Sequence, residues 1–125
     1  MEVPVKVVIF AQRGLFSDSL VSYLISLRGV QVAAVEEELR GAPFVIQQHQ
    51  PQVIILEIRP AQSAEKAALE TAGLVRLGGP QVRCIVLVDT LQQQTYALEA
   101  GAHAAILKGF LNRELDQAVF PQVIQ

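Results

Sequence analysis

Short apolar runs alternate along the chain with segments whose apolar residues recur at helical spacing. The runs are rich in Val and Ile and are continuous rather than alternating with polar residues. Strands that are buried on both faces of a parallel sheet have this pattern. We therefore expect strands at residues 5–10, 30–35, 53–56, 84–88 and 104–107.

The segments between the runs have the marks of helices. In the first of them, Leu20, Leu24 and Leu27 form an apolar stripe, and Gly29 follows as a stop signal. Pro43 stands where a first-turn proline is tolerated, and Pro51 ends that helix. The remaining helices are expected at residues 61–77, 95–100 and 111–119.

The regular alternation of strands and helices predicts the fold class. It implies a parallel sheet with helices on both faces and right-handed crossovers. The usual solution at this length is a flavodoxin-like (βα)5 fold, a doubly wound α/β sheet in three αβα layers with strand order 2-1-3-4-5. We expect one domain over residues 1–125, with its core at about 4–120 and with 121–125 as a tail or the start of a linker.

Composition excludes several classes of protein. Of the 125 residues 51% are hydrophobic and 18% are charged, which argues against disorder. The net charge is −2 and the ten Lys and Arg residues are scattered, so there is no electrostatic footprint for nucleic acid. No apolar run reaches the length of a membrane span, and no signal peptide is evident. We expect a soluble, cytoplasmic protein in which the single cysteine, Cys84, is a buried core residue.

Ligands of doubly wound sheets bind beyond the carboxyl ends of the strands, where the strand order reverses. The residues that end or directly follow the runs are therefore the candidates for chemistry. They are Ala11, Gln12, Arg13, Glu57, Val88, Asp89 and Lys108.

Several of these segments resemble receiver domains of bacterial response regulators, especially those of nitrate-response (LuxR-like) transcription regulators. The resemblance covers nearly the whole chain: residues 5–16 resemble the opening strand and helix entry, and residues 51–57 resemble the strand that ends in the phosphoacceptor. Residues 80–88 resemble the fourth strand, and 100–108 the segment that carries the invariant lysine. The resemblance implies the CheY-like, flavodoxin-like fold expected above.

The same resemblance implies that the phosphorylation site is degraded. The acidic pair that holds Mg²⁺ in the family falls on Ala11 and Gln12, which offer no carboxylate. The phosphoacceptor falls on Glu57, whose extra methylene shifts the carboxylate by about 1 Å, enough to cost on the order of 10²-fold in rate. The hydroxyl falls on Val88 and the reporter aromatic on Ala105, so Lys108 alone is retained.

No cofactor is expected. Asp89 is a spare carboxylate near the site, but it follows the fourth strand, where the family places no ligand, so we expect neither Mg²⁺ binding nor another metal site. His103 has no Cys, Asp or second His at ligand spacing. Nucleophile, P-loop and dinucleotide-binding patterns are absent, so we expect no catalytic residues and no enzyme activity.

Two features of the site allow more than one interpretation. Glu57 and Lys108 are expected to form an ion pair, which either imitates the phosphorylated state permanently or is a relic that spares the lysine an unpaired charge. Arg13 is either a solvated loop arginine or an anion contact at the empty site.

The leading hypothesis is a phosphorylation-independent pseudo-receiver, a protein-interaction or dimerisation module in signal transduction or transcription regulation. The resemblance places its interface on the fourth helix, the fifth strand and the last helix. Tyr96 is the expected anchor unless it packs inward. The candidate interface residues are Gln92, Gln93, Tyr96, Glu99 and Ala104.

Two other hypotheses remain. One is a small-molecule sensor, because Ala11, Val88 and Ala105 would turn a charged pocket into a small apolar one. The other is a working phosphoacceptor with unusual residues. The sequence leaves open the partner, the oligomeric state and whether a DNA-binding domain follows in the natural protein.

Overall fold

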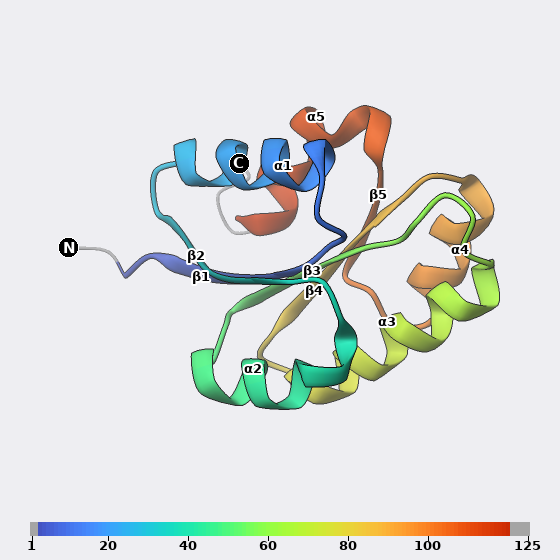
Figure 1. Ribbon diagram of the computed structural model, residues 1–125, viewed down its shortest axis with the longest axis horizontal. Helices are drawn as coiled ribbons and strands as arrows, with labels where there is room; N and C mark the ends of the chain where they lie inside the picture. The colour runs from blue at the N-terminus through green and yellow to red at the C-terminus, as the bar shows by residue number, and fades with distance from the viewer. Residues whose placement is uncertain (1–2, 121–125) are drawn as a thin grey trace.

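The fold is a parallel sheet covered by helices on both faces (Figure 1). The computed structural model describes residues 3–120. Its five strands lie in the order β2-β1-β3-β4-β5, as the alternation predicts. Helices α1 and α5 cover one face, and α2, α3 and α4 cover the other. In chain order the elements are β1 Val5–Phe10, α1 Leu15–Ser26, β2 Val30–Glu36, α2 Ala42–His49, β3 Val53–Glu57, α3 Ala64–Gly78, β4 Arg83–Val88, α4 Leu91–Glu99, β5 Ala104–Leu107 and α5 Leu111–Val119.

Strands β1, β3 and β4 are largely buried as predicted and β5 is buried at its two central residues, but β2 has no buried residue. Its residues are mostly half-exposed, and Val35 has an exposed fraction of 45%. The reason is its place in the sheet: β2 has only β1 as a neighbour, and their register shifts between Val7 and Val8. A continuous apolar run shows that a strand is apolar, but it does not show that the strand is central.

The helix ends follow local capping. Helix α3 begins at Ala64 rather than at residue 61, because the side chain of Ser63 accepts a hydrogen bond from the N–H of Lys66. Helix α2 carries its proline in the first turn and ends before Pro51, where Gln50 adopts a left-handed conformation with φ of 52°.

The core has two layers because side chains alternate across the sheet. Phe10 and Leu56 face α2, α3 and α4, whereas Ile9 and Ile55 face α1 and α5. Cys84 is 1% exposed, and burial raises the pKa of its thiol to about 12, which confirms the expected core role. None of the helices in residues 3–120 is long and apolar enough to span a bilayer.

A polar contact joins the two helices of one face. Tyr23 of α1 donates a hydrogen bond to Asp116 of α5. This bond raises the pKa of Tyr23 to about 12, because it favours the neutral phenol beside the carboxylate. This contact fixes the side of α1 that faces α5. The opposite flank of α1 faces β2.

One buried hydroxyl provides a test of the core. Thr71 of α3 is 0% exposed, and its Oγ1 has no hydrogen-bond partner among the described residues. Thr71→Val keeps the side-chain shape and removes the unpaired group, so we expect it to raise the free energy of unfolding by about 1 kcal/mol. Thr71→Ser, which keeps the hydroxyl and loses the methyl group, should lower it. Urea unfolding measures both, and a destabilised Val variant would show that the hydroxyl has a partner.

Candidate functional site

The carboxyl ends of the strands bring together most of the polar residues that the sequence nominates. Glu57 ends β3, Asp89 follows β4, and Lys108 follows β5. Gln12 follows β1, the neighbour of β3 in the sheet. These residues therefore meet where the strand order reverses, which is the place that the sequence nominated for a site.

Glu57 is nearly enclosed, and both of its carboxylate oxygens are engaged. Its side chain has an exposed fraction of 9%. Oε1 accepts a hydrogen bond from the backbone N–H of Gln12 at 3.0 Å, and Oε2 accepts one from Lys108 Nζ at 3.1 Å. The longer side chain thus spans the space between β1 and β5 and ends on protein donors at both sides.

The ammonium group of Lys108 is saturated in the same way. Its Nζ donates to Glu57 Oε2 at 3.1 Å, to the carbonyl oxygen of Ile58 at 2.8 Å and to Asp89 Oδ2 at 2.9 Å. An ammonium group has three N–H donors, so none is left for a ligand. The group also lies 5.0 Å from the ring centroid of Phe16, within the range of a cation–π contact.

Asp89 has a clear role that its sequence position did not indicate. It supplies the second carboxylate to Lys108, and its side chain has an exposed fraction of 26%. The site therefore contains two carboxylates and one ammonium group. Both carboxylates contact the ammonium group of Lys108, and they do not surround a space that could hold a metal ion. No group of three His, Cys, Asp or Glu residues within the described part of the chain is placed to hold a metal ion.

Ala11, Val88 and Ala105 are packed into the core. Their exposed fractions are 3%, 0% and 8%. A cavity of about 100 Å³ beside Glu57 borders Ala11 and Gln12, but neither Val88 nor Ala105 lines it. The three small residues therefore do not share one apolar pocket at this cavity.

Gln93 was predicted on the interaction face, and the structure corrects this placement. The residue is 2% exposed. Its Oε1 accepts from the N–H of Asp89 at 2.8 Å, and its Nε2 donates to the carbonyl oxygens of Arg59 at 3.2 Å and Gln62 at 2.9 Å. Gln93 thus joins the loop before α4 to the loop before α3. Thr90 caps α4 by accepting a hydrogen bond from the N–H of Gln93. The spacing of Thr90 and Gln93 resembles a capping box, and this spacing is the sequence signal that could have predicted a structural role for Gln93.

A second amide ties α4 to the edge of the sheet. Gln94 Nε2 donates to the carbonyl oxygen of Ala105 in β5 at 2.8 Å. His103 plays a comparable backbone role, since its Nδ1 accepts from the N–H of Cys84 at 2.9 Å. Neither contact is visible in the sequence, because both depend on long-range strand pairing.

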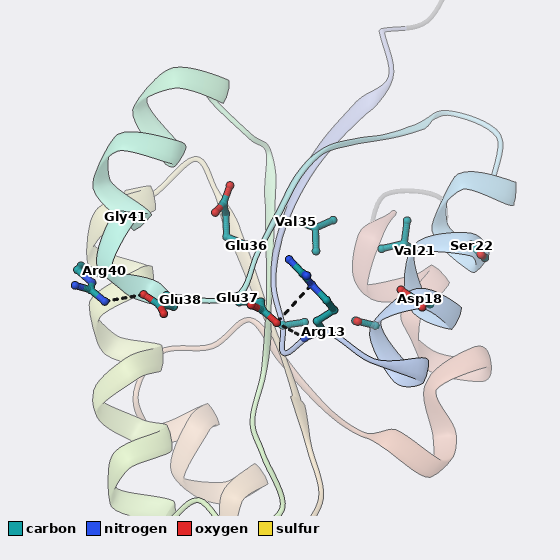
Figure 2. Close-up of a pocket in the computed structure, with 12 residues that line it drawn as sticks. Arg13, Asp18, Val21, Ser22, Val35, Glu36, Glu37, Glu38, Arg40 and Gly41 are labelled. Carbon is teal, nitrogen blue, oxygen red and sulfur yellow. Dashed lines mark hydrogen bonds and ion pairs between the residues drawn. The ribbon is translucent and has the colours of Figure 1, made fainter.

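Arg13 lies apart from Glu57 and Lys108. Its side chain is 85% exposed, its Nε lies 3.8 Å from Glu37 Oε2, and its backbone N–H donates to the same oxygen at 2.9 Å. Figure 2 shows it in a groove of about 890 Å³ between α1 and the end of β2. Arg13 is therefore an exposed arginine at the groove, with Glu37 as its partner. This placement agrees with the interpretation of Arg13 as a solvated loop residue.

Removal of the lysine should be costly. Lys108→Met leaves Glu57 and Asp89 close together without their cation, so we expect the free energy of unfolding to fall by about 2 kcal/mol, less than for a fully buried pair because water screens Asp89. Adding Glu57→Gln should recover part of the loss, because the amide oxygen still accepts from Gln12. Lys66→Met, at an exposed position on α3, is the control and should change stability little; chemical denaturation that gave equal losses for the two lysines would contradict the assignment.

The structure of this chain is similar to several solved structures of response regulators. The signal receiver domain of NarL from Mycobacterium tuberculosis, named as a response regulator, is 25% identical, with a TM-score of 0.72 over 94% of this chain and 98% of that one. The RcsB response regulator of Salmonella typhimurium is 14% identical, with a TM-score of 0.78 over 98% of this chain and 61% of that one. A LuxR-family two-component response regulator from Aurantimonas sp. SI85-9A1 is 13% identical, with a TM-score of 0.73 over 93% of this chain and 85% of that one.

Neither a protein-family model nor a curated protein sequence matches the chain. The last two structures are too distant in sequence to show more than the fold. The structural neighbours are response-regulator receiver domains, and the chain has their flavodoxin-like receiver fold.

Proposed function

We propose that the chain is a receiver-like module that works without phosphorylation and binds a protein partner through the surface of α4 and β5. The observation that carries the proposal is the saturation of Lys108 and Glu57. To take a phosphoryl group, the site would have to break existing contacts, so that the lysine could donate to the phosphoryl oxygens and a carboxylate oxygen could attack. Here each of these atoms already has a protein partner.

Electrostatics supports the same proposal. A phosphoryl group brings negative charge, and Mg²⁺ normally neutralises it through carboxylate ligands and water. Ala11 and Gln12 offer no carboxylate, and Asp89 is bound to Lys108. An incoming phosphoryl group would therefore meet two carboxylates with a single ammonium group between them. We expect neither autocatalytic phosphoryl transfer nor any other enzyme activity.

The two amide contacts of α4 oppose conformational switching. Gln93 holds the loop before α4 to the loop before α3, and Gln94 holds α4 to β5. Moving α4 would expose or unpair these amides, and a buried unpaired polar group costs about 1–3 kcal/mol. We infer that the α4–β5 surface is presented in one fixed form.

The residues of that surface differ from those that the sequence suggested. Because Gln94 bonds to β5, the flank with Leu91 and Leu98 lies towards β5, at spacings of three and four residues. Leu91 is 68% exposed and Leu98 is 47% exposed. Tyr96 lies about 200° around the helix from Gln94 and is partly buried, so we assign the anchor role to the leucines instead.

The other predicted interface residues are more peripheral. Gln92 and Glu99 are exposed, but they follow the outer face of α4, and Ala104 is partly buried in β5. An exposed pair of leucines beside an edge strand is the kind of apolar surface that marks protein interaction sites. It is also poor in charge, as the centres of protein interfaces are.

The small-molecule hypothesis finds less support at this site. The cavity beside Glu57 holds about 100 Å³, whereas pockets for small organic ligands occupy about 300–1,000 Å³. Its lining includes Glu37, Glu57 and Glu70, so it is polar rather than apolar.

The proposed independence of phosphorylation can be tested with Mg²⁺ and beryllofluoride, a phosphoryl mimic. We expect the backbone amide signals of Glu57, Val88 and Lys108 in isotope-labelled protein to stay unchanged up to millimolar magnesium. Lys108 has no free donor for the mimic, and the two carboxylates at the site, Glu57 and Asp89, are already bound to Lys108. Saturable shifts that spread to α4 and β5 would show that the site still responds and would overturn the proposal.

The surface of α4 can be tested with a matched pair of variants. Leu91→Ser combined with Leu98→Ser should abolish retention of the partner that binds the wild-type chain, while leaving the unfolding transition nearly unchanged. Leu69→Ser is the control, because Leu69 of α3 is 75% exposed and lies off this flank. Affinity capture followed by mass spectrometry compares the three proteins, and equal retention by all of them would exclude the leucines as anchors.

A further inference from the structure

The flank of α1 that faces β2 carries two apolar side chains, with a carboxylate before them and a guanidinium group after them. Asp18, Val21 and Ile25 recur at spacings of three and four residues, and Arg28 follows just after the helix ends at Ser26. Such spacing places the three helical residues on one side. Ile25 is 63% exposed although it is a large apolar residue, and Asp18 is the only charged residue of the helix.

Asp18 and Val21 of this flank form part of one wall of the groove of about 890 Å³, and Ile25 lies one turn further along the helix. Figure 2 shows Asp18 and Val21 on the α1 side, with Val35 and Glu36 of β2 across from them. Val35 is 45% exposed. The groove thus has an apolar floor and a carboxylate on each side.

The groove also has an excess of negative charge. Its lining contains four carboxylates, of Asp18, Glu36, Glu37 and Glu38, and two guanidinium groups, which leaves two negative charges over. The guanidinium groups pair with Glu37 and Glu38. Within residues 3–120 no ion pair engages Asp18, Glu36 or Arg28.

The surface formed by these residues is self-complementary, so that two copies of it can pack against each other. If two α1 helices pack antiparallel about a two-fold axis near their midpoints, Arg28 of each copy lies beside Asp18 of the other. The same register sets Ile25 of each copy against Val21 of the other, next to its Val35. A two-fold interface uses the same patch on both partners, so every contact is made twice.

We propose that this chain forms a homodimer through α1, in which the Arg28 guanidinium of each copy enters the acidic groove of the other. The second copy is the occupant because one segment, residues 18–28, carries both halves of the contact. Ile25 and Arg28 insert, and Val21 and Asp18 receive them. Ser22, an exposed small residue of α1, allows the helices to approach closely.

The proposed dimer leaves the α4–β5 surface free. Helix α1 lies on the opposite face of the sheet from α4 (Figure 1). The inference therefore stands independently of the proposed function: one concerns a second copy at α1, the other a different protein at α4. A contact of one helix pair lies at the small end of specific interfaces, so the dimer should depend on concentration.

Charge reversal tests the pairing. Sedimentation velocity of the wild-type chain should show a species of twice the 13.6 kDa monomer mass growing with concentration. Asp18→Arg alone and Arg28→Asp alone should each weaken dimerisation by about tenfold or more, because each places like charges together twice in the dimer. An equal mixture of the two variants should dimerise again, since opposite charges then meet at both ends. This rescue also shows that both variants are folded.

Arg76→Asp is the control, because Arg76 is exposed on α3, on the other face of the sheet, and this variant should dimerise as the wild type does. Three results would overturn the inference: a wild-type chain that stays monomeric up to millimolar concentration, a dimer that survives both reversals, or a mixture that stays monomeric. Loss of the dimer on Leu91→Ser with Leu98→Ser would place the interface at α4 instead.

Discussion

The ammonium group of Lys108 is the contact on which the site depends. It gathers a carboxylate from the end of β3, a backbone carbonyl from the following residue and a second carboxylate from the loop after β4. The lysine itself follows β5, so one charge joins the ends of three strands. Two carboxylates in a partly enclosed site would repel each other strongly without it, and their mutual position is stable because the cation lies between them.

The same contact explains how the proposed loss of phosphorylation chemistry is compatible with a stable fold. A receiver site that lost its acidic pair and kept its lysine would contain an uncompensated cation, which is costly when partly buried. Glu57 removes this cost by reaching both Lys108 and the N–H of Gln12. The interpretation of the ion pair as a device that satisfies the lysine accounts for all of these contacts. Imitation of a phosphorylated state would in addition require a responsive α4, and Gln93 and Gln94 hold that helix in place.

The fold could be predicted from the sequence more completely than the site could. Strand positions and strand order depend on local patterns of Val, Ile, Gly and Pro, which one sequence contains in full. The role of Asp89 and the burial of Gln93 depend on how loops from different strands meet, and residue type alone favoured the surface for both. The exposure of β2 was missed although the predicted strand order places this strand at an edge, because its burial was inferred from its apolar composition alone. The proposed role of Leu91 and Leu98 was not predicted from the sequence, because Tyr is the residue type enriched at interface hot spots and Leu is not.

The layered architecture determines how binding at different surfaces can be related. The sheet separates α1 and α5 from α2, α3 and α4, and its central strands are almost completely buried. Coupling between surfaces on opposite faces requires an element with two arrangements that both ligands bias. In receivers that switch, the pocket at the strand ends would be that element. Here the pocket is closed by Glu57, Asp89 and Lys108, so its state cannot be changed without breaking ion pairs. A partner at α4 and a second copy at α1 should therefore bind independently, and the module would act by bringing proteins together rather than by transmitting a change of shape.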